Sequence, residues 1–331
     1  MRSRSVPALA TLVALAALTA CGTTEDPAED ENTGSGSDSS AAPLTVTDAR
    51  GKEITLDGPA VRVAGTEWNV VEYLVSLGIQ PVGVSDVEGF ETWDSSVQLD
   101  EGVTDIGTRG EPSMDTLATL DLDVVFATDE MVDGALEQIE ENTPVIVVPG
   151  GDVADPLGTM WDNLDLVAQA TGTEDRAAGM RDAFDEALAD GRTALAEAGA
   201  EGANVAFADA YQAGEAVSIR PFGEGSLIGG VLAELGLTNA WSGVEGLEFD
   251  PVYGLGQTDV EGLTALPDDT AFWYIANDSE PDVFTEVLAD NSVWNSLPFA
   301  ADTVRFPDAI WMFGGPASME QFIDAVVDAA S

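Results

Sequence analysis

Histidine is absent from the 331-residue chain, and cysteine occurs once, at Cys21. Histidine is the commonest metal ligand and the commonest general base in proteins, so its absence excludes most zinc sites, histidine-ligated haem and every histidine-dependent catalytic triad. A single cysteine allows no internal disulfide. We therefore expect no metal ion held directly by side chains of this protein.

Basic residues are also scarce: the chain has 11 Lys and Arg and 61 Asp and Glu, which gives a formal net charge of −50. A polyanion of this strength repels phosphate backbones and anionic lipid headgroups, which excludes nucleic acids and charge-driven membrane binding. Hydrophobic residues nevertheless make up 45% of the chain, too many for an acidic disordered protein. The length predicts about two folded domains.

Residues 1–20 are predicted to be a secretion signal, in which Arg2 and Arg4 precede an apolar run from Val6 to Ala20. This run is shorter than the roughly 20 residues that span a bilayer, which disfavours the alternative of a retained membrane helix.

The end of this signal, Leu18-Thr19-Ala20-Cys21, resembles the lipobox of bacterial lipoproteins. The resemblance implies that Cys21 becomes the N-terminus and carries lipid chains, palmitate among them, since stable anchoring requires more than one chain. We expect an extracytoplasmic protein, anchored to the outer face of the cytoplasmic membrane through this lipid only. Residues 21–43 would then be the lipidated cysteine and a disordered acidic tether.

From Leu44 onward, strand and helix patterns alternate, and the same order of segments occurs twice. The matching pairs are Val71–Ile79 with Val231–Leu237, Leu117–Phe126 with Leu263–Trp273, and Thr143–Val147 with Thr303–Phe306. In the first pair an amphipathic helix ends at a glycine, and in the second a short helix and a turn precede an apolar strand. The repeat predicts an α/β protein made of two similar Rossmann-like lobes with largely parallel strands.

Residues 173–199 lie between the two halves and are predicted to form one long helix. Four apolar residues fall on one face of it: Met180, Phe184, Leu188 and Leu195. Thr173 is expected to cap its start and Gly199 to end it. At 1.5 Å per residue the helix would be roughly 40 Å long, enough to cross both lobes. The alternative is an ordinary surface helix of the second lobe.

The predicted organisation is a signal (1–20), a tether with the lipidated cysteine (21–43), an N-terminal lobe (44–172), a linking helix (173–199) and a C-terminal lobe (200–331). If the helix is the only connection, the lobes are joined by a stiff rod and large hinge closure is not expected. A ligand would then bind in a largely preformed cleft between the lobes.

Four segments indicate the protein family to which the chain is similar: Glu67–Leu74, Leu77–Val84, Asp105–Ser113 and Trp311–Gly315. They resemble the iron-siderophore-binding lipoproteins of ABC importers, especially the ferric-hydroxamate branch, over about residues 63–327. The G-x-R-x-E-P motif at Gly107–Pro112 is the most specific part. The resemblance implies the helical-backbone fold of metal-chelate binding proteins, and a monomer that is not an enzyme and has no cofactor. It also implies capture of a ferric siderophore and its delivery to an ABC permease and ATPase for iron uptake.

In the ferric-hydroxamate branch the arginine of this motif contacts the oxygen atoms around the chelated Fe³⁺, which implies this role for Arg109. A planar cation with several donors suits oxygens that already ligate iron and carry partial negative charge. The alternative is an ion pair between Arg109 and one of the many nearby acids. Because the chain has no cluster of Lys and Arg, a neutral or cationic hydroxamate complex fits better than an anionic tris-catecholate.

The same branch lines its cleft with aromatic and apolar side chains, and the matching positions are Trp93, Trp241, Trp311, Met312 and Phe313. Flat apolar faces suit the methylene linkers of a siderophore. Burial in the core is the alternative, which we prefer for Trp273 because it lies inside an apolar strand. The match is incomplete: residues 127–131 lack the aromatic that the branch has there, and Phe313 lacks a hydroxyl. A different siderophore or a looser pocket would accommodate both departures.

Proteins of this family dock on their permease through one acid on each lobe. The matching positions are Asp115, where glutamate is usual, and Glu261. The alternative for each is an ordinary solvated surface acid.

Two other functions stay open. Related binding proteins of this architecture carry a corrinoid or another large metal chelate, which is the main alternative ligand. A secreted carboxylate-dependent hydrolase, such as a glycosidase, is more remote, because in so acidic a chain paired carboxylates occur by chance. The sequence also contains neither a nucleophile elbow nor a Gly-rich phosphate loop.

Overall fold

The computed structural model describes residues 42–331 apart from residues 133 and 215. The predicted signal, the lipidation site Cys21 and most of the predicted tether lie outside the described residues. In the described part of the chain, none of the helices combines the length and the hydrophobicity that crossing a membrane requires.

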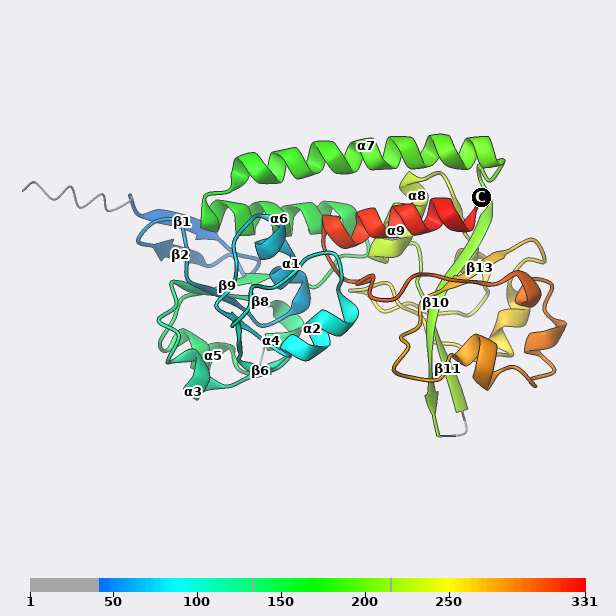
Figure 1. Cartoon of the computed structure of the whole chain (residues 1–331), viewed down its shortest axis with the longest axis horizontal. Coiled ribbons are helices and arrows are strands. Elements are labelled where there is room, and N and C mark those ends of the chain that lie inside the picture. Colours follow the sequence, from blue (N-terminus) through cyan, green and yellow to red (C-terminus); the bar gives the residue numbers. More distant parts are fainter. Residues whose placement is uncertain (1–41, 133, 215) are drawn as a thin grey trace, which may run out of the picture. The chain divides into compact units, whose positions relative to one another are not determined.

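The N-terminal lobe is built on a five-stranded sheet in the order β5-β4-β3-β8-β9 (Figure 1). Neighbouring strands in it are parallel. The chain starts at the centre, builds outward to one edge and then to the other, as in a doubly wound sheet. Its strands are β3 (Val63–Gly65), β4 (Gly83–Val84), β5 (Thr104–Asp105), β8 (Val124–Thr128) and β9 (Val145–Val148).

Helices and two antiparallel hairpins complete this lobe. The helices are α1 (Trp68–Ser76), α2 (Val87–Trp93), α3 (Met114–Leu117), α4 (Asp129–Val132), α5 (Leu136–Glu140) and α6 (Pro156–Thr171). The hairpins pair β1 (Leu44–Thr47) with β2 (Glu53–Leu56), and β6 (Gly107–Thr108) with β7 (Glu111–Pro112).

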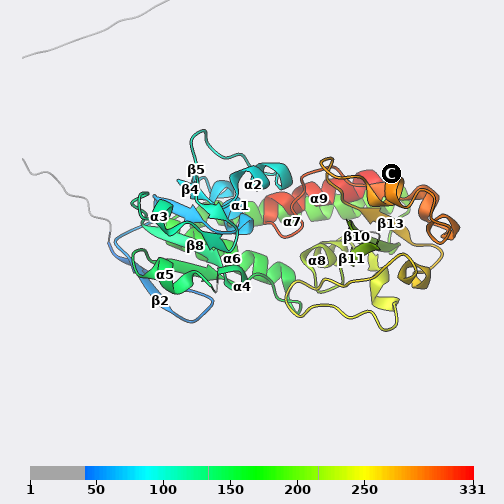
Figure 2. The same ribbon diagram turned by 90° about the horizontal axis from the view of Figure 1, so that it is seen from below.

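The C-terminal lobe has a second sheet, in the order β11-β10-β13-β14, with β12 beside the first residues of β10. Only β11 is antiparallel to its neighbour among the described strands of this sheet. Figure 2 shows β10, β11 and β13 together in this lobe, apart from β4, β5 and β8 in the other. The strands are β10 (Asn204–Ala213), β11 (Ala216–Pro221), β12 (Thr238–Asn239), β13 (Ala271–Tyr274) and β14 (Val304–Arg305).

The remaining elements of this lobe are two α-helices and several short turns of other helix types. They are α8 (Leu227–Glu234), α9 (Pro316–Ala329), the 3₁₀ turns η1 (Ala240–Gly243), η2 (Gly262–Ala265), η4 (Trp294–Ser296) and η5 (Ala300–Asp302), and the π turn η3 (Val283–Val287).

The two lobes repeat one another locally, as the paired segments of the sequence predict. Helices α1 and α8 both end at a glycine with a left-handed backbone, Gly78 at φ 83° and Gly236 at φ 80°, a conformation that other residues adopt only at a cost. Each then continues into a short strand, β4 or β12, that pairs in parallel with the first strand of its sheet.

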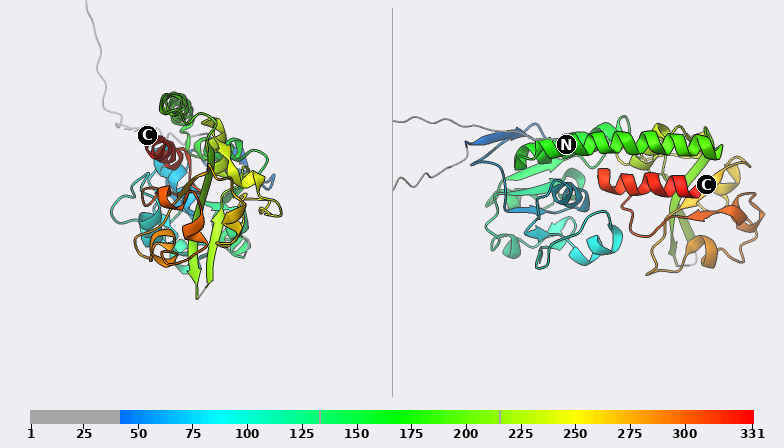
Figure 3. Two further views of the ribbon diagram at one scale, coloured as in Figure 1. Left: turned by 90° about the vertical axis from the view of Figure 1, so that its right-hand side faces the viewer. Right: turned by 45° about the horizontal axis from the view of Figure 1, so that its top comes forward.

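Helix α7 (Glu174–Ala198) runs along both lobes (Figures 1 and 3). It buries Phe184, Leu188 and Leu195 and ends at Gly199, whose φ is 76°. Thr173 lies at the N-cap position of α7, as predicted, but its side chain makes no capping hydrogen bond; its hydroxyl is paired with that of Thr171 at 2.9 Å. The predicted fold class, two similar Rossmann-like lobes joined by one long helix, is confirmed.

The lobes also share one continuous hydrophobic core beneath α7. Leu74 and Phe126 of the N-terminal lobe, Phe184 of α7, and Phe207 and Phe322 of the C-terminal lobe belong to it. Helices α6 and α8, from opposite lobes, contact each other, and α9 packs against α7. Separating the lobes would expose this apolar core to water, which is unfavourable. The core therefore holds the lobes together in addition to α7.

Candidate ligand-binding cleft

A cleft of about 450 Å³ lies between the two lobes and is lined by residues of both. From the N-terminal lobe come Glu67, Trp68, Asn69, Trp93, Arg109, Thr128, Met131 and Gly150, and from the C-terminal lobe Asp209, Arg220, Tyr253, Leu255, Ile275 and residues 310–313. Glu67 follows β3, Thr128 ends β8 and Ile275 follows β13. The cleft thus lies at the carboxyl ends of parallel strands, the usual position of ligand sites in such sheets.

Arg109 lies in this cleft, in the turn between β6 and β7, and its charge is paired. Its Nε donates a hydrogen bond of 2.9 Å to Oε2 of Glu67, and a terminal nitrogen donates to the other carboxylate oxygen. The guanidinium carbon lies 4.1 Å from the ring centroid of Trp68 and 5.2 Å from that of Trp311. Arg109 therefore forms the ion pair that was the alternative, and it also lines the cleft; its contact with a ligand stays a prediction.

Aromatic side chains form much of the cleft wall. Trp93 ends α2 and is half-buried, and Trp311, Met312 and Phe313 follow one another along the cleft. The ring centroids of Trp68 and Trp311 are 4.8 Å apart, and those of Trp311 and Phe313 are 5.2 Å apart. These edge-to-face contacts fix the rings relative to each other.

Trp241 is placed in the core rather than in the cleft, which corrects the prediction for this residue. It is 1% exposed, and its indole N–H donates a 2.9 Å hydrogen bond to the carbonyl of Phe207. The chain turns into η1 directly after β12, and this turn directs the indole under the second sheet, against Phe272. Trp273 is likewise in the core, 4% exposed, as predicted.

The second arginine of the cleft, Arg220, was not predicted from the sequence. Arg220 on β11 is the cross-strand partner of Asp209 on β10, and its Nε donates a 2.9 Å hydrogen bond to Oδ1 of Asp209. Its guanidinium carbon lies 5.5 Å from the ring centroid of Phe313. Burial raises the pKa of Asp209, and the charge of Arg220 opposes that rise. An arginine between Ile219 and Pro221, in a strand whose other residues are uncharged, was the available signal.

Tyr253 was also missed, and it supplies a phenol to a cleft whose N-terminal wall lacks one at residues 127–131. The carboxylate of Asp250 accepts hydrogen bonds from the backbone N–H groups of Val252, Tyr253 and Leu255 and so shapes this turn. A Cβ atom at Gly150 would lie 2.3 Å from the Tyr253 hydroxyl. Glycine at position 150 therefore allows the phenol to approach the opposite lobe.

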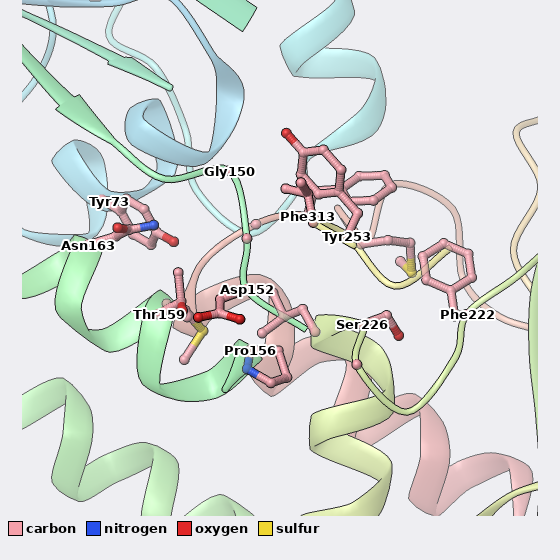
Figure 4. A pocket seen from close by; sticks show the side chains of 17 residues that line it. Tyr73, Gly150, Asp152, Pro156, Thr159, Asn163, Phe222, Ser226, Tyr253 and Phe313 are labelled. Atoms are coloured by element: carbon pink, nitrogen blue, oxygen red, sulfur yellow. The ribbon is translucent and has the colours of Figure 1, made fainter. Parts of the chain in front are cut away.

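A second, smaller cavity shares Tyr253 and Phe313 with the cleft lining (Figure 4). Its volume is about 30 Å³, and Tyr73, Asp152, Thr159, Asn163 and Ser226 are among its lining residues. This space suits one or two water molecules. It is too small for a metal chelate, which leaves the larger cleft as the candidate site.

Glu72 connects the two lobes beside the cleft, and sequence reasoning assigned it no role. It lies on α1, is 0% exposed, and accepts hydrogen bonds from the backbone N–H groups of Gly315 and Ser318 at 2.7 and 2.9 Å. The hydroxyl of Ser318 donates a third bond, of 2.7 Å. Burial and the neighbouring charge of Asp94 raise the pKa of Glu72 to about 8. These bonds hold the start of α9, and with it residues 311–313, against α1.

Among the described residues, no group of three or more acids and cysteines is arranged to hold a metal ion.

A family model described as "Periplasmic binding protein" matches residues 63–305. The chain belongs to this family. This periplasmic binding protein is 24% identical over 274 residues to the iron(3+)-hydroxamate-binding protein FhuD of Escherichia coli (strain K12), an alignment that covers 79% of this chain and 84% of the relative. It is 23% identical over 312 residues to the probable siderophore-binding lipoprotein YfiY of Bacillus subtilis (strain 168), covering 92% and 90% of the two chains.

Among solved structures, this periplasmic binding protein is similar in fold to the siderophore-binding protein FhuD from Vibrio cholerae, determined with Fe³⁺–Desferal bound. The TM-score is 0.70 at 24% sequence identity, and the match covers 81% of this chain and 97% of that one. The two-lobed architecture of the described residues is thus that of a known group of binding proteins.

The two acids predicted to dock this periplasmic binding protein on a permease lie on different lobes. Asp115 is in the first turn of α3, and Glu261 directly precedes η2. Both side chains are exposed. Their accessibility allows them to serve as contacts, and the docking role stays a prediction.

Proposed function

We propose that this periplasmic binding protein captures a ferric siderophore of the hydroxamate type outside the cell and delivers it to an ABC permease and its ATPase for iron uptake. The observation that carries the proposal is Arg109, held by Glu67 and Trp68 in an aromatic-lined cleft between the lobes. The relatives support it, since one is named an iron(3+)-hydroxamate-binding protein and a similar structure holds Fe³⁺–Desferal.

The chemistry of the cleft suits a chelate that brings its own iron ligands. A guanidinium has five N–H donors, and Glu67 engages the Nε and one terminal nitrogen of Arg109. The remaining donors can reach hydroxamate oxygens, which bear partial negative charge while they ligate Fe³⁺. The rings of Trp93, Trp311 and Phe313 would pack on the methylene linkers. The protein in this proposal is a binding protein without catalytic activity or resident cofactor.

The proposed location follows from the N-terminal sequence. Cleavage before Cys21 and lipidation of its thiol would anchor the folded part to the outer face of the cytoplasmic membrane, with residues 22–43 as tether. A monomer suffices for this role, because the cleft is complete within one chain.

Ligand titration followed by tryptophan fluorescence tests the proposed function. Ferrioxamine- and ferrichrome-type complexes should quench the emission, because three tryptophans, Trp68, Trp93 and Trp311, line the cleft. Unchanged emission with these complexes, together with quenching by cobalamin, would replace the siderophore by a corrinoid. Mass spectrometry of the protein purified from iron-starved cells would identify the natural ligand.

A further inference from the structure

Each arginine of the cleft is neutralised by a carboxylate of its own lobe. Arg109 is paired with Glu67, and Arg220 is paired with Asp209. No other charged side chain occurs among the described residues that line the cleft. The formal charge of the cleft wall is therefore zero, although it contains two guanidinium groups.

Both pairs are held in place by more than the ion pair itself. The side chain of Glu67 is 6% exposed and that of Asp209 is 20% exposed, so neither carboxylate is an ordinary surface acid. The guanidinium carbon of Arg109 lies 4.1 Å from the Trp68 ring centroid, and that of Arg220 lies 5.5 Å from the Phe313 centroid. Before a ligand binds, both arginines are therefore already fixed in position, and their charges are already balanced by the two carboxylates.

Charges within the cleft should affect ligand binding more than the many acids on the rest of the surface do. Exposed charges more than about 8–10 Å away are screened at physiological salt, whereas charges in a partly buried, apolar site interact more strongly. An anionic chelate would have to shed water against a wall that offers no net positive charge in return. A cationic group is better tolerated, since aromatic faces such as those of Trp93 and Trp311 attract cations.

We propose that Glu67 and Asp209 determine the charge selectivity of the cleft: by cancelling the charges of Arg109 and Arg220, they make it accept neutral and monocationic ferric chelates and disfavour anionic ones. This inference rests on the proposed function and specifies its ligand class. Glu67 and Asp209 act through the arginines and are positioning residues that also set the net charge.

Three ligands that share the same iron centre but differ in charge at one end separate the effect of ligand charge from that of ligand shape. Ferrioxamine B carries a terminal ammonium, its N-acetyl derivative is uncharged there, and its N-succinyl derivative carries a carboxylate. In the wild-type protein the succinyl complex should bind about five- to tenfold more weakly than the acetyl complex, as expected for one charge in a partly buried site. This difference should persist in 1 M salt, where the Debye length is about 3 Å, because charges inside a partly buried cleft are screened much less than exposed ones. Loss of the difference in 1 M salt would assign it to the exposed surface acids instead.

Neutralising either carboxylate should abolish the preference. Glu67→Gln and Asp209→Asn should each strengthen binding of the succinyl complex relative to the acetyl complex by about five- to tenfold. The matched control is Asp165→Asn, because Asp165 also pairs with an arginine, Arg181, but lies outside the cleft lining. It should leave all three dissociation constants unchanged.

The outcomes separate this inference from the proposed function. Equal affinity of the wild-type protein for all three complexes, or a parallel loss for all three in both variants, would overturn the charge role and leave siderophore binding intact. No binding of any complex by folded wild-type protein would overturn both. Thermal unfolding establishes that each variant is folded, and the wild-type series at two salt concentrations decides the question if a variant is not.

Discussion

Glu72 of the N-terminal lobe accepts two hydrogen bonds from Ser318 of the C-terminal lobe, one from its backbone N–H and one from its hydroxyl. Ser318 lies in the first turn of α9, where backbone N–H groups lack partners within the helix. The fully buried carboxyl group of Glu72 thus completes the start of a helix more than 240 residues further along the chain.

The buried position of Glu72 predicts a pH-dependent stability. The pKa of Glu72 is raised to about 8 from an ordinary 4.5, so between these values the folded protein holds a proton that the unfolded chain releases. The contribution is therefore fully present below about pH 4.5 and is lost as the pH rises toward 8. We expect Glu72 to lower the free energy of unfolding by about 1–3 kcal/mol between pH 5 and pH 8.5.

Urea unfolding of the wild-type protein and of Glu72→Gln at both pH values checks this prediction. The variant cannot ionise there and should show a flatter pH dependence. The exposed Glu186 on α7 provides the control: Glu186→Gln should keep the wild-type slope. An identical slope in all three proteins would show that Glu72 is ionised throughout.

Arg109→Ala should weaken binding of a ferric hydroxamate by about 1–3 kcal/mol, the scale of a charge-assisted contact. Arg181 provides a close control, because it too pairs with a carboxylate and lies over a tryptophan, Trp161, at 4.4 Å, but outside the cleft lining. Arg181→Ala should leave the dissociation constant unchanged. Isothermal titration measures both, and equal affinity of the two variants would remove Arg109 from the site.

The tryptophans should separate into two groups by function. Trp93→Phe and Trp311→Phe should reduce both the affinity for the ferric complex and the ligand-induced quenching, since both rings line the cleft. Trp241→Phe should instead leave affinity nearly unchanged and lower the free energy of unfolding by about 1–3 kcal/mol, because a buried hydrogen-bonded indole is lost. Weakened binding without destabilisation in Trp241→Phe would contradict the placement of Trp241 in the core.

The docking acids should affect transport without affecting ligand capture. Asp115→Ala combined with Glu261→Ala should lower siderophore-dependent iron uptake in cells while the dissociation constant of the isolated protein stays the same. Glu137 and Glu286 are exposed acids of the two lobes, and their combined alanine variant is the control. Uptake equal to the control would make both predicted docking positions ordinary surface acids.

The fold could be predicted from the sequence because each of its main features leaves a local pattern. Helix endings at Gly78 and Gly236 and the apolar face of α7 are all visible along the chain. The cleft depends on pairings between distant segments. Asp209 and Arg220 become partners only through the register of β10 and β11, and Glu72 only through the packing of α9 on α1.

The tryptophans show, at single positions, the same limit of prediction from the sequence. Trp93 and Trp241 are each followed directly by a polar residue, Asp94 and Ser242, so their immediate sequences do not distinguish a cleft wall from a core. The difference arises from the turn that follows: the chain after β12 enters a 3₁₀ turn that places Trp241 beneath the sheet, whereas Trp93 ends a helix whose end faces the cleft.

The core shared beneath α7 also bears on how a transporter would tell a loaded protein from an empty one. Leu74 and Phe126 of one lobe and Phe207 and Phe322 of the other belong to this core, and none of the four lines the cleft. The lobes are therefore held together by packing that lies outside the cleft. If Asp115 and Glu261 are the docking points, the distance between them would be the same with and without a bound ligand. The permease would then detect a bound ligand through the part of the chelate that protrudes from the cleft. Release of the ligand would have to be driven by the permease.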